Sequence, residues 1–104
     1  MTASVRVANL SDLASGQGKL VEVNGRPIGL FNCNGEFYAL DNICVHRGGP
    51  LSEGFVDCIN RTVQCPWHGW TYDLGTGAAT FNPLARVEKF DVATDGEDIQ
   101  VGLE

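Results

Sequence analysis

Hydrophobic and polar residues alternate along this chain in short segments separated by glycines, of which there are 13. Near the C-terminal end, Ile99, Val101 and Leu103 recur at every second position, which is the spacing of one face of a β-strand. The segments expected to form strands are Lys19–Val23, Arg26–Asn32, Glu36–Leu40, Arg61–Gln64, Trp70–Asp73, Val87–Val92 and Ile99–Leu103. The pattern therefore predicts an all-β fold.

The connections between these segments carry turn signals. Asn24-Gly25 and Asn34-Gly35 each lie between apolar runs, so the first three strands are expected to form a meander of tight hairpins. Asp95-Gly96 separates the last two strands in the same way. Ser11–Ser15 is the only helical signal, a single turn with Ser11 or Asp12 as its cap. Without longer helical patterns, a βαβ nucleotide-binding fold is excluded.

Two short loops hold the residues with distinctive chemistry. Cys44–Pro50 contains Cys-x-His and Cys65–Trp70 contains Cys-x2-His, and the two motifs account for both histidines of the chain. Chance rarely places every histidine within three residues of a cysteine in two Gly- and Pro-containing loops. The four residues Cys44, His46, Cys65 and His68 are therefore the candidate metal ligands.

Two metal centres fit a Cys2His2 set. Zinc binds such ligands tetrahedrally, but structural zinc sites usually take both cysteines from one Cys-x2-4-Cys segment, whereas each loop here supplies one cysteine and one histidine. The other centre is a two-iron, two-sulfide cluster in which two histidines replace two of the four thiolates. The distribution of ligands over the loops favours the cluster.

With these motifs, and with Gly48, Gly49, Pro50, Pro66 and Gly69 flanking them, the chain resembles a Rieske-type ferredoxin over nearly its whole length. The resemblance implies one [2Fe-2S] cluster per chain and a single domain, residues 1–104. It also implies a small antiparallel β-sandwich with the two cluster-binding loops as a cap.

The same resemblance implies the role of each site residue. Cys44 and Cys65 would bind the inner iron, and His46 and His68 the outer, solvent-facing one. Trp67 and Trp70 flank His68 and are candidates for screening the cluster from water. Phe81–Leu84 is expected to be a third loop that closes over the site.

The composition limits the possible partners and the cellular compartment of the protein. A net charge of −6 disfavours binding to the phosphate backbone of a nucleic acid. No apolar run approaches the roughly 18 residues that span a bilayer, and the N-terminal residues have no signal-peptide pattern. Four cysteines are too few for a disulfide scaffold, so we expect a reducing cytoplasm. Cys33 and Cys58 are then expected to be reduced thiols, although a bond between them remains open.

Counting ligands separates the possible functions. A Rieske oxygenase needs a further mononuclear iron site, usually two histidines and a carboxylate, and both histidines are already committed to the cluster. The ligand count therefore favours an electron carrier and not an enzyme.

Membrane-bound Rieske subunits have a transmembrane anchor and two more cysteines, at the positions that Gly49 and Trp67 occupy in this chain.

By resemblance, this carrier would pass electrons from a flavin-dependent NAD(P)H reductase to a terminal aromatic-ring-hydroxylating dioxygenase. The alternative is the small subunit of an assimilatory nitrite reductase. Three acidic residues near the loops, Glu53, Asp57 and Asp73, are candidates for steering a basic partner.

Overall fold

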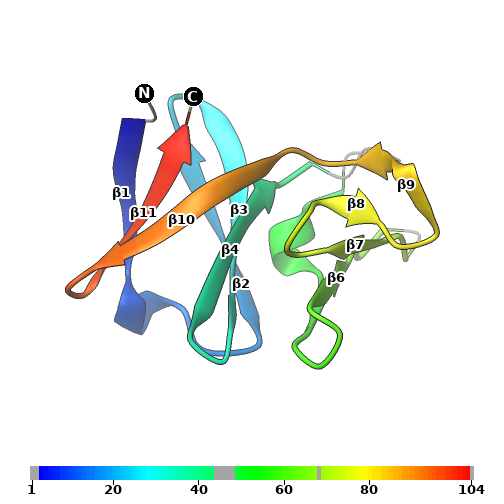
Figure 1. Ribbon diagram of the computed structural model, residues 1–104, viewed down its shortest axis with the longest axis horizontal. Helices are drawn as coiled ribbons and strands as arrows, with labels where there is room; N and C mark the ends of the chain where they lie inside the picture. The colour runs from blue at the N-terminus through cyan, green and yellow to red at the C-terminus, as the bar shows by residue number, and fades with distance from the viewer. Residues whose placement is uncertain (1–2, 44–48, 68, 104) are drawn as a thin grey trace.

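The computed structural model describes residues 3–43, 49–67 and 69–103, which form two antiparallel sheets (Figure 1). The six-stranded basal sheet comprises β1 (Ala3–Asn9), β2 (Gln17–Val23), β3 (Arg26–Cys33), β4 (Glu36–Asp41), β10 (Lys89–Asp95) and β11 (Asp98–Leu103). The five-stranded upper sheet comprises β5 (Phe55–Asp57), β6 (Thr62–Gln64), β7 (Thr71–Asp73), β8 (Ala78–Ala79) and β9 (Asn82–Arg86). The prediction of an all-β antiparallel fold is confirmed.

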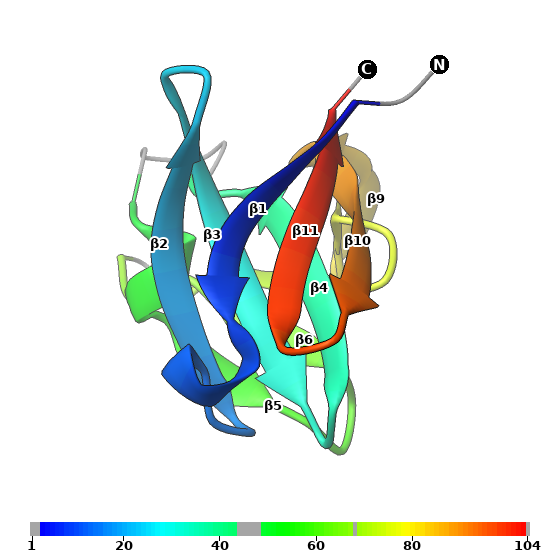
Figure 2. The same ribbon diagram turned by 90° about the vertical axis from the view of Figure 1, so that its left-hand side faces the viewer.

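The basal sheet follows the order β1-β11-β10-β4-β3-β2 and wraps around its own core (Figure 2). β10 pairs with β4 only through Lys89 and Phe90, so the sheet bends at this junction. Of the alternating apolar residues near the C-terminal end, Ile99 and Val101 are fully buried, as is Ile28 of β3. A second core lies between the basal and upper sheets; it includes Phe31, Leu40, Val63, Cys65, Tyr72 and Leu74.

Both Asn-Gly hairpins form as predicted. Asn24 and Gly25 have φ values of 53° and 80°, and Asn34 and Gly35 have φ values of 56° and 89°. Positive φ at both central residues is the requirement of a type I′ turn, which asparagine and glycine tolerate best. In the last hairpin Asp95 pairs with Asp98, so the two-residue connection is Gly96-Glu97.

The N-terminal helical turn is shorter than predicted and has a different cap. A single 3-10 turn, η1, spans Leu10–Asp12, and its cap is Asn9 and not Ser11 or Asp12. The Asn9 side chain accepts a hydrogen bond from the Ser11 amide (3.2 Å), and Asp12 accepts one from the Asn9 amide (3.0 Å). A second 3-10 turn, η2, spans Leu51–Glu53. In the described part of the chain, no helix is long and apolar enough to cross a membrane.

The sequence patterns missed strands β1, β5, β8 and β9 and placed the start of β10 too early. β5 and β8 have three and two residues, too few for alternation to be recognised. Val87 precedes β10 because its amide donates to the Gly77 carbonyl (2.9 Å), which ties it to the upper sheet.

The expectation that Cys33 and Cys58 are separate reduced thiols is wrong in this structure, which joins them as a disulfide. Cys33 ends β3, and Cys58 begins the turn between β5 and β6. Packing of the upper sheet on the basal sheet brings their Cα atoms to 5.2 Å, although their positions are 25 apart in the sequence. A separation of that size gave the sequence no sign of the contact.

Candidate metal centre

The two loops that carry the predicted ligands are each closed at the base. Ile43 and Pro50 form an antiparallel bridge, and the Leu51 amide donates to the Asn42 carbonyl (2.8 Å), which closes the first loop. The second loop is closed by the Cys65 amide, which donates to the Trp70 carbonyl (2.7 Å). Of the predicted ligands, Cys65 is described, whereas Cys44, His46 and His68 lie outside the described residues.

Cys65 lies where the two loops meet. Its residue is 1% exposed and belongs to the core between the sheets. The Trp67 amide donates to its sulfur (3.4 Å), and a Cβ added to Gly49 of the first loop would lie 2.7 Å from the same atom. A sulfur with a backbone donor and a close glycine suits an anionic thiolate ligand, because the donor stabilises its charge and the glycine leaves it room.

Gly49 allows the first loop to approach the second. Besides the Cys65 sulfur, its added Cβ would lie 3.1 Å from the Cβ of Trp67. Membrane-bound Rieske subunits have their two extra cysteines at these two positions, so the close approach of residues 49 and 67 agrees with the resemblance. Here a glycine facing a tryptophan takes the place of that link.

We expect Gly49→Ala to weaken the metal centre, because the new methyl group would overlap the Cys65 sulfur and the Trp67 side chain. The iron content of the purified variant, measured by optical absorption and metal analysis, should fall clearly below that of the wild type. Gly35→Ala is the control for glycine loss: its φ is 89°, but its added Cβ meets nothing within 4 Å. Full iron content in Gly49→Ala would contradict the proposed loop contact.

Gln64 is a site residue that the sequence did not single out. It precedes Cys65, and its side-chain Nε2 donates to the Gly69 carbonyl (3.2 Å), across the second loop. Gly69 has a φ of 73°, which glycine adopts without strain. The amide of Gln64 therefore supports the loop between Cys65 and Trp70 from the side of β6, and only its place next to a ligand could have drawn attention to it.

The aromatic residues near the second loop differ in how far their side chains are buried. Trp67 is 51% exposed, so about half of its surface faces solvent. Trp70 is half-buried and meets Phe81 edge-on, with ring centroids 4.6 Å apart. The expected third loop is only partly correct, because Asn82–Leu84 belong to strand β9 and Phe81 lies in the turn before it.

The three acidic residues of the steering prediction all reach solvent. Glu53 ends η2 and is exposed, and Asp57 and Asp73 lie in one row of the upper sheet, each opposite Thr62. Hydrogen bonds from Asn60 and from the Ile59 amide lower the pKa of Asp57, so its carboxylate is charged at neutral pH.

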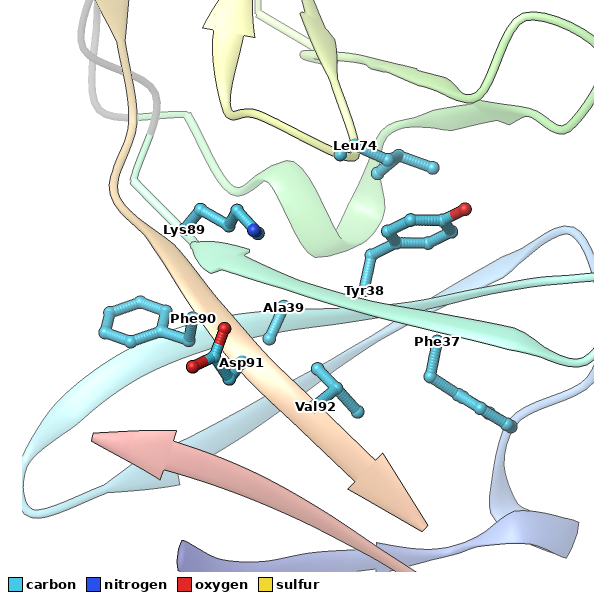
Figure 3. A pocket seen from close by; sticks show the side chains of 9 residues that line it. Phe37, Tyr38, Ala39, Leu74, Lys89, Phe90, Asp91 and Val92 are labelled. Atoms are coloured by element: carbon cyan, nitrogen blue, oxygen red, sulfur yellow. The ribbon is translucent and has the colours of Figure 1, made fainter. Parts of the chain in front are cut away.

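A cavity of about 270 Å³ lies apart from this centre, where β10 leaves β4 after Phe90 (Figure 3). Its walls include Phe37, Tyr38, Lys89 and Val92, with Leu74 above them. In the part of the chain that the structure describes, none of its lining residues belongs to the two ligand loops.

A family model decides between the interpretations of these loops. The model of the Rieske [2Fe-2S] domain matches residues 3–91, which include both loops and strands β1 to β9 and end near the start of β10. The chain belongs to the Rieske [2Fe-2S] family. A Rieske domain holds a [2Fe-2S] cluster, which accepts and releases one electron, and the buried Cys65 sulfur with its amide donor fits a ligand of that cluster.

Known proteins of similar sequence and structure include electron-transfer components. This Rieske domain is 33% identical to the ferredoxin component of the naphthalene 1,2-dioxygenase/salicylate 5-hydroxylase systems of Ralstonia sp., over 96% of this chain and 95% of that one. It matches, at 27% identity and a TM-score of 0.84, a chain in the complex of reduced oxygenase and oxidised ferredoxin of carbazole 1,9a-dioxygenase, covering 94% and 91% of the two chains.

A nitrite reductase protein is also a structural neighbour of this Rieske domain. The putative NADH-dependent nitrite reductase small subunit of Mycobacterium tuberculosis matches with a TM-score of 0.92 and 24% identity, over 100% of this chain and 97% of that one. At this identity the match shows a shared fold.

Proposed function

We propose that this Rieske domain is a one-electron carrier whose cluster is held by Cys44 and Cys65 on one iron and by His46 and His68 on the other. The buried Cys65 sulfur between the two loops is the observation that supports this most strongly. Membership of the family supports the cluster, and the motif spacing supports the other three ligands.

We propose further that the electrons pass from a flavin-dependent NAD(P)H reductase to a terminal aromatic-ring-hydroxylating dioxygenase. The similarity to a dioxygenase ferredoxin component extends over nearly the full length of both chains. NAD(P)H donates a hydride, which carries two electrons, so the flavin splits the pair and this carrier makes two trips for each NAD(P)H. Because NAD(P)H is a cytoplasmic coenzyme, the cytoplasm is the compartment that fits this role.

The nitrite reductase small subunit remains the second candidate function. Its support is the shared fold of the Mycobacterium tuberculosis neighbour, at 24% identity. The dioxygenase relative shares more of the sequence, at 33% identity, so the carrier role is preferred.

Partner binding would use an apolar surface on the elements that follow Cys65. Trp67 is 51% exposed, Phe81 is 59% exposed and Leu84 is 90% exposed. Exposed apolar side chains near a redox centre suit the small, transient interface of an electron-transfer complex. We expect Leu84→Glu to slow electron delivery to the oxygenase about tenfold, because it places a charge in a surface that becomes dry.

Ile59→Glu is the matched control for this prediction, since Ile59 is 94% exposed and lies in the β5–β6 turn, away from the loop after Cys65. The two variants have the same charge change, and both should keep the reduction potential of the wild type. Stopped-flow reduction of the oxygenase would measure their rates. Equal rates for the two variants would show that the partner does not contact Leu84.

Reconstitution tests the proposed function. The purified carrier is mixed with NADH, a flavin-dependent ferredoxin reductase, a ring-hydroxylating oxygenase and an aromatic substrate. We expect NADH oxidation and product formation that depend on the carrier and are lost with Cys65→Ser. Support of a sirohaem nitrite reductase, with no transfer to any oxygenase tried, would establish the second candidate instead.

A further inference from the structure

The Cys33–Cys58 disulfide joins the basal sheet to the segment that connects the two cluster loops. The segment between these loops runs through η2, β5 and β6, and Cys58 lies near its middle. The bond fixes this segment to the end of β3 in the basal sheet. The chain enclosed between Cys33 and Cys58 contains the whole first loop. Strand β6 leads directly from the turn that contains Cys58 to Cys65.

An ion pair also joins the β5–β6 turn to the β3–β4 hairpin. Arg61, in the β5–β6 turn that contains Cys58, pairs with Glu36 of the β3–β4 hairpin (2.8 Å), and both side chains are more than half exposed. Exposed ion pairs of this kind contribute little to stability. The apolar core between the sheets remains when the disulfide opens, so opening loosens the turn without unfolding the domain.

The two sulfurs differ in access. Cys33 is 2% exposed, whereas Cys58 is half-buried and is followed by Ile59 and Asn60, which are both exposed. A thiolate from solvent can therefore reach Cys58 more easily than Cys33. In the cytoplasm, the compartment that fits the proposed function, disulfides are usually transient or redox-sensing. Together these features suit a bond that is made and broken during the life of the protein.

We propose that Cys33 and Cys58 form a second, two-electron redox centre, a reversible staple that controls how firmly the cluster is retained. A thiolate of a protein or small dithiol attacks Cys58, the Cys33–Cys58 bond breaks, and Cys33 leaves as a thiolate that takes up a proton. The second thiol of the reductant then attacks the mixed disulfide, which releases Cys58 as a thiol and leaves the reductant oxidised. In the reverse exchange a disulfide of the same class accepts the two electrons and leaves as a dithiol, so the Cys33–Cys58 bond forms again and ties the segment between the cluster loops to β3.

Two measurements on the holoprotein test the staple. After equilibration in buffers of graded reduced and oxidised dithiothreitol, the protein is denatured, alkylated and weighed by mass spectrometry. The oxidised form should bind two alkyl groups, on Cys44 and Cys65, and the reduced form should bind four, with a single transition between them. In parallel, the loss of visible absorbance to an excess of iron chelator should be roughly tenfold faster in the reduced form, because the connecting segment is no longer held.

The variant Cys33→Ala/Cys58→Ser is the control, and its rate of iron loss should match the reduced wild type in every buffer. A protein that shows four alkylated cysteines in every buffer, or two in every buffer, would overturn the reversible couple. Equal rates of iron loss from the two wild-type forms would overturn the link to the cluster. The inference depends on the proposed cluster only in its second measurement, so failure of the ligand assignment leaves the cysteine count interpretable.

Discussion

Replacing Cys65 by serine removes the cluster: the purified variant should be colourless and contain no iron. The substitution exchanges a thiolate for a hydroxyl, which loses its proton far less readily and is a much weaker iron ligand, at a position that is 1% exposed and already supplied with an amide donor. Cys44→Ala, His46→Ala and His68→Ala should have the same result. The wild type should contain two irons and two acid-labile sulfides per chain and no zinc, as measured by metal analysis and sulfide assay.

Cys58→Ser is the control for these ligand variants, because it also removes a thiol but at a position outside the two loops. Prepared without air and without chelator, it should keep both irons. Loss of colour in Cys58→Ser, or retained colour in Cys65→Ser, would contradict the ligand assignment.

Opening the disulfide should have the next largest effect, on the free energy of unfolding. A cross-link that closes a loop of this size, with a sequence separation of 25 residues, stabilises a domain by about 3.5 kcal/mol, mainly by restricting the unfolded chain. For a domain of this length, that corresponds to a fall in Tm of roughly 15–25 °C. Urea or thermal unfolding of the oxidised wild type and of Cys33→Ala/Cys58→Ser would measure the difference.

Arg61→Ala provides the comparison for this effect. It removes the exposed ion pair with Glu36 that links the same two turns, and we expect a loss of less than about 1 kcal/mol. An equal loss of unfolding free energy in both variants would show that the ion pair, and not the disulfide, holds the β5–β6 turn to the β3–β4 hairpin.

The sequence predicted the parts of this fold that depend on local geometry. Asn24-Gly25 and Asn34-Gly35 adopt the positive φ values that their residue types favour, and the long alternating strands lie close to their expected bounds. Short strands such as β8 depend on pairing with distant segments, so their own residues contain little signal.

Contacts between the two sheets could not be predicted for the same reason. The Cys33–Cys58 bond and the approach of Gly49 to the Cys65 sulfur both join residues that meet only after the sheets and loops have packed. The ligand motifs needed no such packing to be recognised, since each combines a cysteine and a histidine within four residues. The metal ligands could therefore be predicted from the sequence, whereas the contacts of the Cys65 sulfur with Gly49 and the Trp67 amide could not.

The reduction potential depends first on the charge of the cluster. Two ferric ions, two sulfides and two thiolates sum to zero, and neutral imidazoles add nothing, whereas four thiolates would give a charge of −2. Histidine ligation therefore raises the potential from about −400 mV into a range of roughly −150 to +300 mV.

We expect three features of this chain to lower the potential within that range. Trp70 stands where high-potential relatives have a serine that donates to a sulfide, Gly49 and Trp67 replace the loop-tying cysteines, and the net charge of −6 disfavours an added electron. Two features raise it: Tyr72 stands where those relatives have a tyrosine, and the Trp67 amide donates to the Cys65 sulfur. On balance we expect roughly −150 to 0 mV, which suits electrons that come from NAD(P)H through a flavin.

Protein-film voltammetry at neutral pH tests the proposed carrier most directly. We predict one reversible one-electron wave at roughly −150 to 0 mV, which Cys65→Ser abolishes. A zinc protein would give no wave, and a four-cysteine cluster would respond near −400 mV. A wave above about +150 mV, or no wave at all, would contradict the account of this Rieske domain as the ferredoxin of a dioxygenase system.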